Sequence, residues 1–170
     1  DGNPPPPCDV IAKLPGTPEA DQWVLRGNHH DAWVNGAEDP ISGLVAELEE
    51  ARALGQLVKQ GWKPKRTIIY AAWDGEEPGL LGSTEWVETH QDELAKHAVA
   101  YINSDTNGRG YLGIEGSPIL EKFINGVERD VTDPEPNHSV WKRNQARSFR
   151  RCPPEVCEDQ RIHTLGSWLA

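Results

Sequence analysis

Histidine and carboxylate side chains follow three apolar segments of the chain, at the point where each segment ends. The segments are residues 23–25, 67–73 and 98–102. The side chains that follow them are His29 and Asp31, then Asp74, Glu76 and Glu77, and finally Asp105. Imidazole and carboxylate groups form hydrolytic zinc sites with a position left open for water, whereas closed structural zinc sites favour thiolates. The residue types therefore predict a hydrolytic metal site.

Two adjacent glutamates, Glu76 and Glu77, could take two different roles at such a site, metal ligand and base. The side chains of neighbouring residues diverge, so one glutamate can bind metal while the other faces the open position as a base. A base beside a dication needs a pKa suited to taking a proton from water. A carboxylate can also bridge two ions about 3.5–4 Å apart, so that both act on water and substrate. The pair is therefore consistent with a two-metal hydrolase.

These side chains can meet if the apolar segments are neighbouring parallel strands, because the functional crevice of an open α/β sheet lies beyond the carboxyl ends of its strands. Residues 67–73 are typical of a strand covered on both faces, and residues 98–102 predict another buried strand. Residues 10–14 and 23–25 predict two further strands. Helices are predicted over residues 42–60, 80–97 and 118–131, the first with an apolar face of Leu44, Leu48, Ala51 and Leu54. This alternation predicts an α/β layered fold.

Composition narrows the class of partner. The 170 residues carry a formal net charge of −10, which argues against nucleic acid or an anionic membrane surface, because both need clustered cations. No stretch is long and apolar enough to span a membrane. The cysteines at positions 8, 152 and 157 lack the short spacing of a structural zinc site. The sequence does not decide whether Cys152 and Cys157 form a local disulfide. The chain contains no Met and is interpreted as a piece of a longer protein.

Three motifs occur in order along the chain. The first covers residues 27–33 (GNHHDAW) and 36–43 (GAEDPISG), the second residues 73–86 (WDGEEPGLLGSTEW) and the third residues 101–105 (YINSD). Together they resemble the metal motifs of the glutamate carboxypeptidase II and transferrin receptor branch of the aminopeptidase-like metallopeptidases. The match runs from residue 10 to residue 124 and more loosely to residue 167. The resemblance implies a three-layer α/β/α sandwich with a central mixed, mostly parallel sheet.

The resemblance also implies a role for each candidate residue. Two zinc ions are expected, one bound by His29 and Asp105 and the other by Glu77, with Asp39 as the bridging ligand. Glu76 is the expected general base. Transferrin receptors share the fold but lack the ligand set, so the presence of these acids favours a catalytic peptidase over a receptor. The implied function is a co-catalytic dizinc exopeptidase acting on peptides by metal-activated water.

Further expectations come from the same resemblance. Asp31 is expected to accept a hydrogen bond from the second ring nitrogen of His29 and so to orient the ring. The complete protein is expected to form a homodimer and to be secreted, periplasmic or extracellular-facing. The alternative function is a non-catalytic, receptor-like or truncated scaffold for protein contacts.

Each assignment has a structural alternative. His29 could be a core histidine, Asp39 before Pro40 could be a helix N-cap, and Asp105 could be a turn residue. Glu76 and Glu77 could favour a helix N-terminus electrostatically. His30 is not expected to be a ligand. The remaining candidates are interpreted as surface residues: Glu38, Asp74, His90, His97 and His138.

The chain departs from the family pattern at its C-terminal end. The family's second zinc takes one more His, downstream of a segment that residues 161–167 resemble only at its beginning. That final ligand is absent here, and His163 is not expected to replace it. The predicted organisation is an extended Pro-rich lead over residues 1–8, a partial peptidase domain over residues 9–132 and an irregular or helical segment over residues 133–170. Residues 141–151 are interpreted as a basic, solvated helical face.

Overall fold

The structure, a computed structural model, describes residues 6–135 and 137–151. The chain divides after Gly108 into two units, residues 1–108 and 109–170. Every residue proposed for the metal site lies in the first unit. Within the described part of the chain, no helix is both long and apolar enough to cross a membrane.

The first unit is built on a four-stranded sheet with the order β1-β3-β2-β4. The strands are β1 (Val10–Leu14), β2 (Glu19–His29), β3 (Arg66–Trp73) and β4 (Ala98–Asn103). Strand β2 pairs in parallel with both β3 and β4, whereas β1 pairs antiparallel with β3. The three strands that precede the candidate ligands are therefore parallel neighbours, and the predicted mixed, mostly parallel sheet is confirmed.

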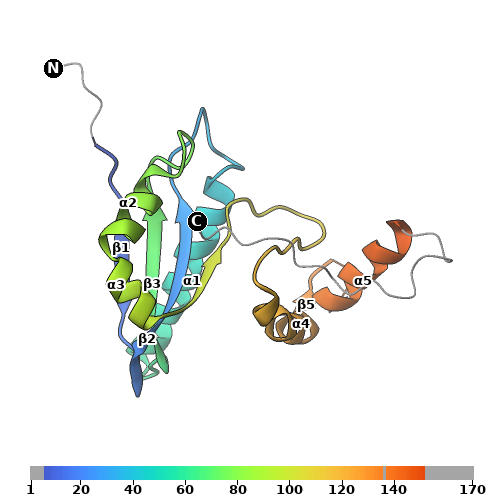
Figure 1. The fold of residues 1–170 in the computed structure, drawn as a ribbon. Coiled ribbons are helices and arrows are strands. Elements are labelled where there is room, and N and C mark those ends of the chain that lie inside the picture. Colours follow the sequence, from blue (N-terminus) through green and yellow to red (C-terminus); the bar gives the residue numbers. More distant parts are fainter. Residues whose placement is uncertain (1–5, 136, 152–170) are drawn as a thin grey trace. The chain divides into compact units, whose positions relative to one another are not determined.

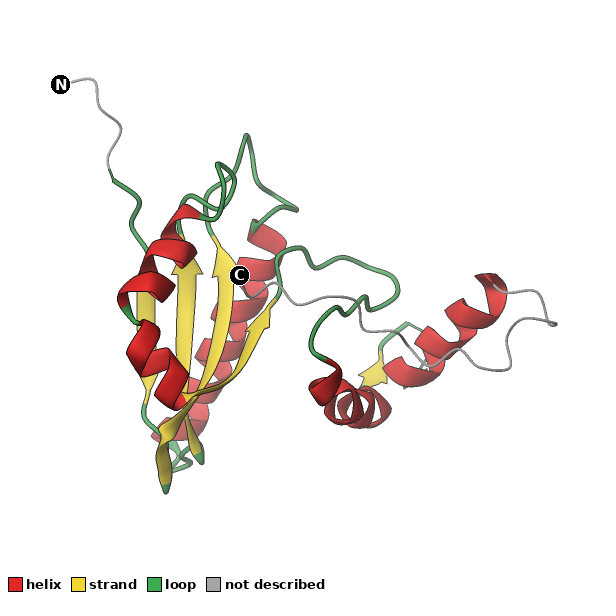
Figure 2. Ribbon diagram, viewed as in Figure 1, coloured by secondary structure: helices red, strands yellow, loops and turns green. Residues whose placement is uncertain are grey.

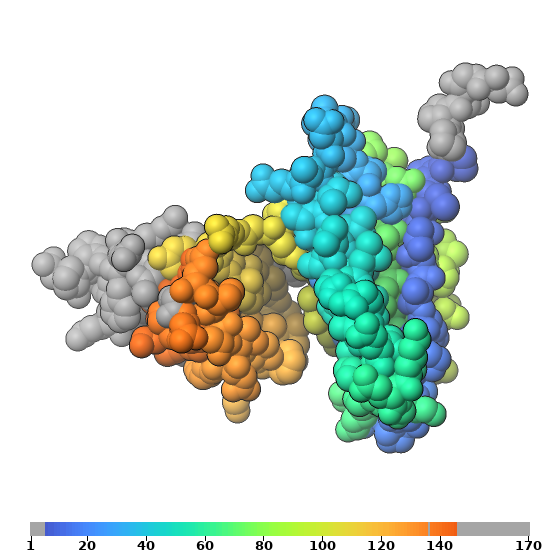
Figure 3. Space-filling view, turned by 180° about the vertical axis from the view of Figure 1, so that it is seen from behind, coloured from blue at the N-terminus to red at the C-terminus, as the bar shows by residue number. Residues whose placement is uncertain are grey.

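Helices cover both faces of this sheet. Helix α1 (Ile41–Lys59) contacts β2 and β3. Helices α2 (Leu81–Thr89) and α3 (Gln91–His97) lie on the opposite face, in front of the sheet in Figure 1, whereas α1 lies in front when the unit is seen from behind in Figure 3. Figure 2 shows the strands between the two helical layers. The predicted three-layer α/β/α arrangement is confirmed.

The core of the first unit is centred on β3, as its continuous apolar run predicts. The buried apolar residues are Leu25, Ile69, Tyr70, Ala71 and Trp73. The prediction that residues 98–102 form a buried strand is wrong, because Val99 and Ile102 are 49% and 45% exposed. Strand β4 pairs only with β2 in the described residues, so it forms an edge of the sheet there.

Helix α1 departs from the predicted apolar face at Leu48, whereas Leu44, Ala51 and Leu54 are half-buried. Leu48 was expected on the apolar face but is 61% exposed, whereas Glu47 beside it is 3% exposed. Gly43 is also buried at the first turn of the helix. Glu47 rather than Leu48 thus lies on the buried side of α1, which places a carboxyl group against the sheet.

The second unit contains short elements. They are the 3₁₀ helix η1 (Pro118–Leu120), α4 (Glu121–Asp130), β5 (Thr132–Asp133), β6 (His138–Ser139) and α5 (Val140–Arg151). The predicted solvated basic face is wrong for Arg143, whose guanidinium contacts Asp133 and Glu135, each at 2.7 Å. The side chains of Arg147, Arg150 and Arg151 lie outside the described residues, as do Cys152, Cys157, His163 and the segment 161–167. The predicted boundary after residue 132 stays a prediction.

Candidate metal centre

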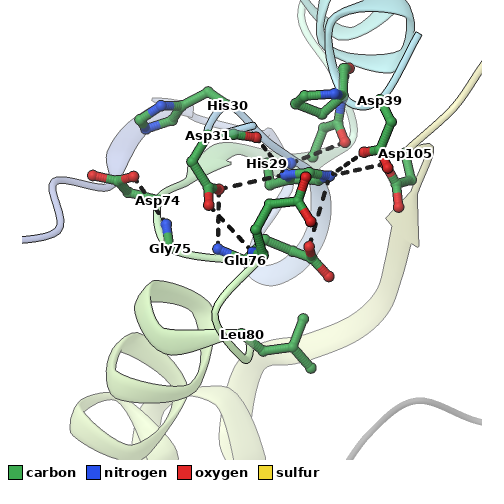
Figure 4. A network of polar contacts seen from close by, with 12 residues as sticks. His29, His30, Asp31, Asp39, Asp74, Gly75, Glu76, Leu80 and Asp105 are labelled. Atoms are coloured by element: carbon green, nitrogen blue, oxygen red, sulfur yellow. Dashed lines mark hydrogen bonds and ion pairs between the residues drawn. The ribbon is translucent and has the colours of Figure 1, made fainter. Parts of the chain in front are cut away.

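The carboxyl ends of β2, β3 and β4 bring the candidate ligands together (Figure 4). His29 is the last residue of β2, and its strand partner is Trp73, the last residue of β3. Gly27 pairs with Asn103 at the end of β4. Parallel strands that end at the same level place the residues that follow them at one edge of the sheet, so Glu76 and Asp105 reach the imidazole of His29.

Three side chains form a group that could hold one metal ion. The Nε2 atom of His29 lies 3.0 Å from Oδ1 of Asp39 and 2.9 Å from Oδ1 of Asp105. One possible ligand atom from each residue lies within 4.8 Å of the others. Zinc binds nitrogen and oxygen at about 2.0–2.2 Å, so two ligands of a tetrahedral site are about 3.3 Å apart. A small opening of the group would therefore admit the ion.

The second ring nitrogen of His29 is held by Asp31. Nδ1 lies 3.0 Å from the Asp31 backbone oxygen and 3.4 Å from its Oδ1 atom. This contact leaves Nε2 facing the two carboxylates, as a metal-binding imidazole requires. Burial alone would lower the pKa of His29, but the hydrogen bond and charge of Asp105, helped by Glu76 and Asp31, raise it. A divalent cation could replace the proton that these acids favour.

The carboxylate of Asp31 has a second set of partners that the sequence did not indicate. Its Oδ1 atom accepts the backbone N–H of Glu76 at 2.9 Å, and Oδ2 accepts that of Glu77 at 3.2 Å. Burial alone would raise the pKa of Asp31, but these two hydrogen bonds outweigh it and lower the pKa. Asp31 therefore links His29 to the loop of residues 74–80, called the glutamate loop below.

The two glutamates point in different directions. Oε2 of Glu76 lies 4.0 Å from Nε2 of His29. Burial raises the pKa of Glu76, the charge of His29 opposes it, and the charges of Asp105, Glu77 and Asp31 add to the increase. A carboxylate with a raised pKa near a metal group is suited to general-base work. Glu77 is not part of the three-residue group; its Oε1 atom accepts the backbone N–H of Trp33 at 3.3 Å.

The structural alternatives for Asp39, Glu76 and Glu77 find little support, whereas His29 is only 3% exposed, as a core histidine would be. The N-cap of α1 is Pro40 and makes no side-chain capping hydrogen bond, so Asp39 does not cap this helix. Helix α2 begins only at Leu81, so Glu76 and Glu77 lie outside its first turn. His30 points away from the group, and its Nε2 atom lies 3.2 Å from the Cys8 carbonyl oxygen.

Asp74 was interpreted as a surface residue, but it is half-buried and anchors the glutamate loop. Its Oδ2 atom accepts the N–H of Cys8 at 2.8 Å, and its Oδ1 atom accepts that of Gly75 at 2.9 Å. In return, Oδ1 of Asp9 accepts the N–H of Asp74 at 2.8 Å. The partners are 65 and 66 positions apart, so no local pattern could reveal them. The antiparallel pairing of β1 with β3 brings them together.

The fold and this group define a class, an α/β protein with a His/Asp/Asp group that could bind a metal ion at the carboxyl edge of its sheet. Residues 9–138 match the model of Peptidase family M28, and the chain belongs to this family. The family resemblance of the three motifs is thereby confirmed.

Named relatives and a solved structure agree with this membership. The chain is 45% identical over 138 residues to "Probable glutamate carboxypeptidase VP8" of Zea mays, covering 78% of this chain and 19% of that protein. It is 37% identical over 162 residues to "Aminopeptidase NAALADL1" of Mus musculus, covering 94% of this chain and 22% of that protein. The chain thus spans about a fifth of the length of these relatives. A crystal structure of a Peptidase M28 precursor from Shewanella amazonensis is 31% identical with a TM-score of 0.54, covering 71% of this chain and 27% of that one.

Proposed function

We propose that the chain carries most of the metal-binding part of a co-catalytic dizinc exopeptidase that hydrolyses peptide bonds. The observation that supports this most directly is the group of His29, Asp39 and Asp105, with Glu76 beside it. The donor set of one imidazole and carboxylates is that of hydrolytic zinc, and among the described residues no thiolate belongs to the group.

The proposed roles follow the positions of the side chains. His29 and Asp105 hold the first zinc ion. Asp39, whose side chain is 55% exposed, would offer one carboxylate oxygen to each of the two ions and so act as the bridging ligand. Glu77 would supply a ligand to that second ion, in exchange for its contact with the Trp33 N–H. Because the described residues offer this second ion fewer ligands than the first, we propose that it would bind more weakly.

Zinc, when bound, polarises the substrate carbonyl and lowers the pKa of the attacking water. Glu76 takes the proton of that water, because its carboxylate faces the metal group and its pKa is raised by burial. It then passes the proton to the leaving amine of the peptide. Asp31 contributes by holding both His29 and the backbone of the glutamate loop, which fixes the base relative to the ligands.

The substrates and partners of the whole protein belong to the same proposal. Peptides are the proposed substrates, and the complete protein is proposed to form a homodimer in a secreted, periplasmic or extracellular-facing location. The alternative is a non-catalytic scaffold for protein contacts. The observation that favours this alternative is that Glu77, the proposed ligand of the second zinc ion, lies outside the three-residue group.

The test is Glu76→Gln in the 170-residue chain, with zinc content and hydrolysis of short peptides measured on the same samples. Peptides blocked at either end distinguish removal of amino-terminal from carboxy-terminal residues. We expect normal zinc content and a loss of hydrolysis of about 10²-fold or more. Unchanged hydrolysis at normal zinc content would refute the role of Glu76. One zinc or less in the wild-type chain, without turnover, would favour the scaffold.

A further inference from the structure

A buried arginine lies close to the metal group but plays no part in the roles assigned above. Arg26 is on β2, three residues before His29, and its side chain is only 9% exposed. A guanidinium in such a position must satisfy five N–H donors, because an unpaired charge away from water is very costly. Its hydrogen-bond partners therefore show what the residue holds in place.

The guanidinium of Arg26 connects three segments of the first unit. Nε donates to Oε2 of Glu50 on α1 at 3.2 Å. Nη1 donates to the carbonyl oxygens of Gly27 at 3.1 Å and Ile102 at 3.3 Å. Nη2 donates to Oγ of Ser104 at 2.5 Å. The side chain thus ties α1 to the end of β4, one residue before Asp105.

The end of β4 has few other supports among the described residues. The pairing of β4 with β2 ends at Asn103, and the next backbone hydrogen bond, from Ser104 N–H to the Gly27 oxygen, is long at 3.4 Å. On the α1 side, a Cβ added at Gly43 would lie 1.8 Å from the Ser104 oxygen and 2.1 Å from the Asp105 oxygen. The backbone that carries Asp105 is therefore held by Arg26 and by contacts with α1, one of them the hydrogen bond from the Asn107 N–H to Oγ of Ser42 at 2.8 Å.

We propose that Arg26 is a positioning residue for the metal group, which sets the place of Asp105 opposite His29 by holding Ser104. The inference rests on the proposed function, because it takes Asp105 as a metal ligand. Arg26 touches neither the ligand atoms nor the substrate position, so its effect on zinc passes through Ser104. The Glu50 carboxylate anchors the guanidinium, and its other oxygen accepts the Tyr70 hydroxyl at 3.2 Å.

The experiment compares zinc affinity across matched variants of the 170-residue chain, by competition with a chromophoric chelator. Ser104→Ala removes one contact and leaves Arg26 its charge partner, so this variant is expected to fold. Arg26→Lys keeps the positive charge but loses the planar guanidinium group, whose N–H donors bind Glu50 and Ser104 at the same time. The controls are Ser139→Ala, which deletes a hydroxyl in the second unit, and Arg66→Lys, which changes an arginine paired with Glu19 at 3.2 Å.

Removal of partners that orient metal ligands lowers metal affinity by about 10–100-fold. We expect a loss of zinc affinity of about 10-fold for Ser104→Ala and somewhat more for Arg26→Lys. The double variant is expected to lose no more than Arg26→Lys alone, because both changes remove the same contact. The two controls are expected to stay within about twofold of the wild type.

A merely structural role would give a different result. In that case the variants would lower the free energy of unfolding of the zinc-free chain, measured separately by urea denaturation, and would bind zinc as tightly as the wild type. That outcome overturns the inference and leaves the proposed function intact. A wild-type chain that takes up no zinc overturns the proposed function itself and this inference with it.

Discussion

The buried carboxyl group of Glu47 makes the stability of the fold depend on pH in an unusual direction. Glu47 is 3% exposed on the sheet-facing side of α1, and its Oε2 atom has no hydrogen-bond partner. Burial raises the pKa of this carboxyl from its ordinary value of 4.5 to about 7, although the charge of Arg26 opposes the increase. The folded chain therefore holds a proton on Glu47 over a range of pH in which the unfolded chain has lost it.

The sign and size of the effect follow from proton linkage. Between about pH 4.5 and pH 7 the folded state binds more protons than the unfolded state, so stability falls as the pH rises. The interval from 4.5 to about 7 corresponds to a loss of at most about 3 kcal/mol of unfolding free energy from this group. Glu47→Gln removes the titration, because a neutral amide occupies the same place at every pH.

The measurement is urea denaturation of the zinc-free chain at pH 5, 6, 7 and 8, for the wild type and for Glu47→Gln. We expect the stability of Glu47→Gln, relative to the wild type, to rise with pH by up to about 3 kcal/mol over this range. The control is Glu49→Gln on the same helix, which removes an exposed pair with Arg52 and should change stability little. Parallel pH profiles for the wild type and Glu47→Gln would refute the reasoning.

Three further predictions concern the metal group and its supports. Gly43→Ala is expected to lower both the free energy of unfolding and the zinc affinity, because the added methyl group would clash with the backbone that carries Asp105. In the control Gly55→Ala, on the same helix, the methyl group meets no atom within 4 Å and should stabilise the fold by about 0.5–1 kcal/mol. Urea denaturation and zinc titration measure both variants. Asp31→Asn leaves one carbonyl oxygen for two N–H groups of the glutamate loop, so zinc affinity should fall about 10-fold or more. Chelator competition measures this affinity, and an unchanged value would contradict the role of Asp31 in linking His29 to the glutamate loop. Zinc must displace the proton that neighbouring acids favour on His29, so zinc affinity from calorimetry should rise from pH 6 to pH 8, and a flat profile would contradict this.

The local elements and the three motifs could be predicted from the sequence because their signals are local. The apolar run of residues 67–73 predicts a covered strand, and β3 (Arg66–Trp73) is the centre of the core. Helix boundaries were predicted to within one residue at α1, where Gly61 follows the last turn. His29, Glu77 and Asp105 were found because each lies at or after the end of a strand, and the carboxyl ends of parallel strands lie at one edge of a sheet. Asp39 was found only through the resemblance of its motif to the family.

The exposure of β4 and the contact face of α1 could not be predicted in the same way. The apolar residues of 98–102 read as a buried strand, but burial depends on the neighbours of a strand in the sheet, and β4 has only one among the described residues. Likewise, the position of Leu48 in the helical repeat does not show that Glu47 faces the sheet. The charge of Arg26 offsets part of the cost of burying this carboxyl group, although burial still raises its pKa.

The sequence by itself therefore determined the fold class and the family and indicated candidate metal ligands, since these depend on residue type, periodicity and order along the chain. Only the tertiary structure decided which side chains hold that group in place. Asp31 meets the glutamate loop across 45 positions and Arg26 meets Ser104 across 78. Such contacts depend on how the strands pair and how α1 packs on them, because the residues in contact are far apart in the sequence.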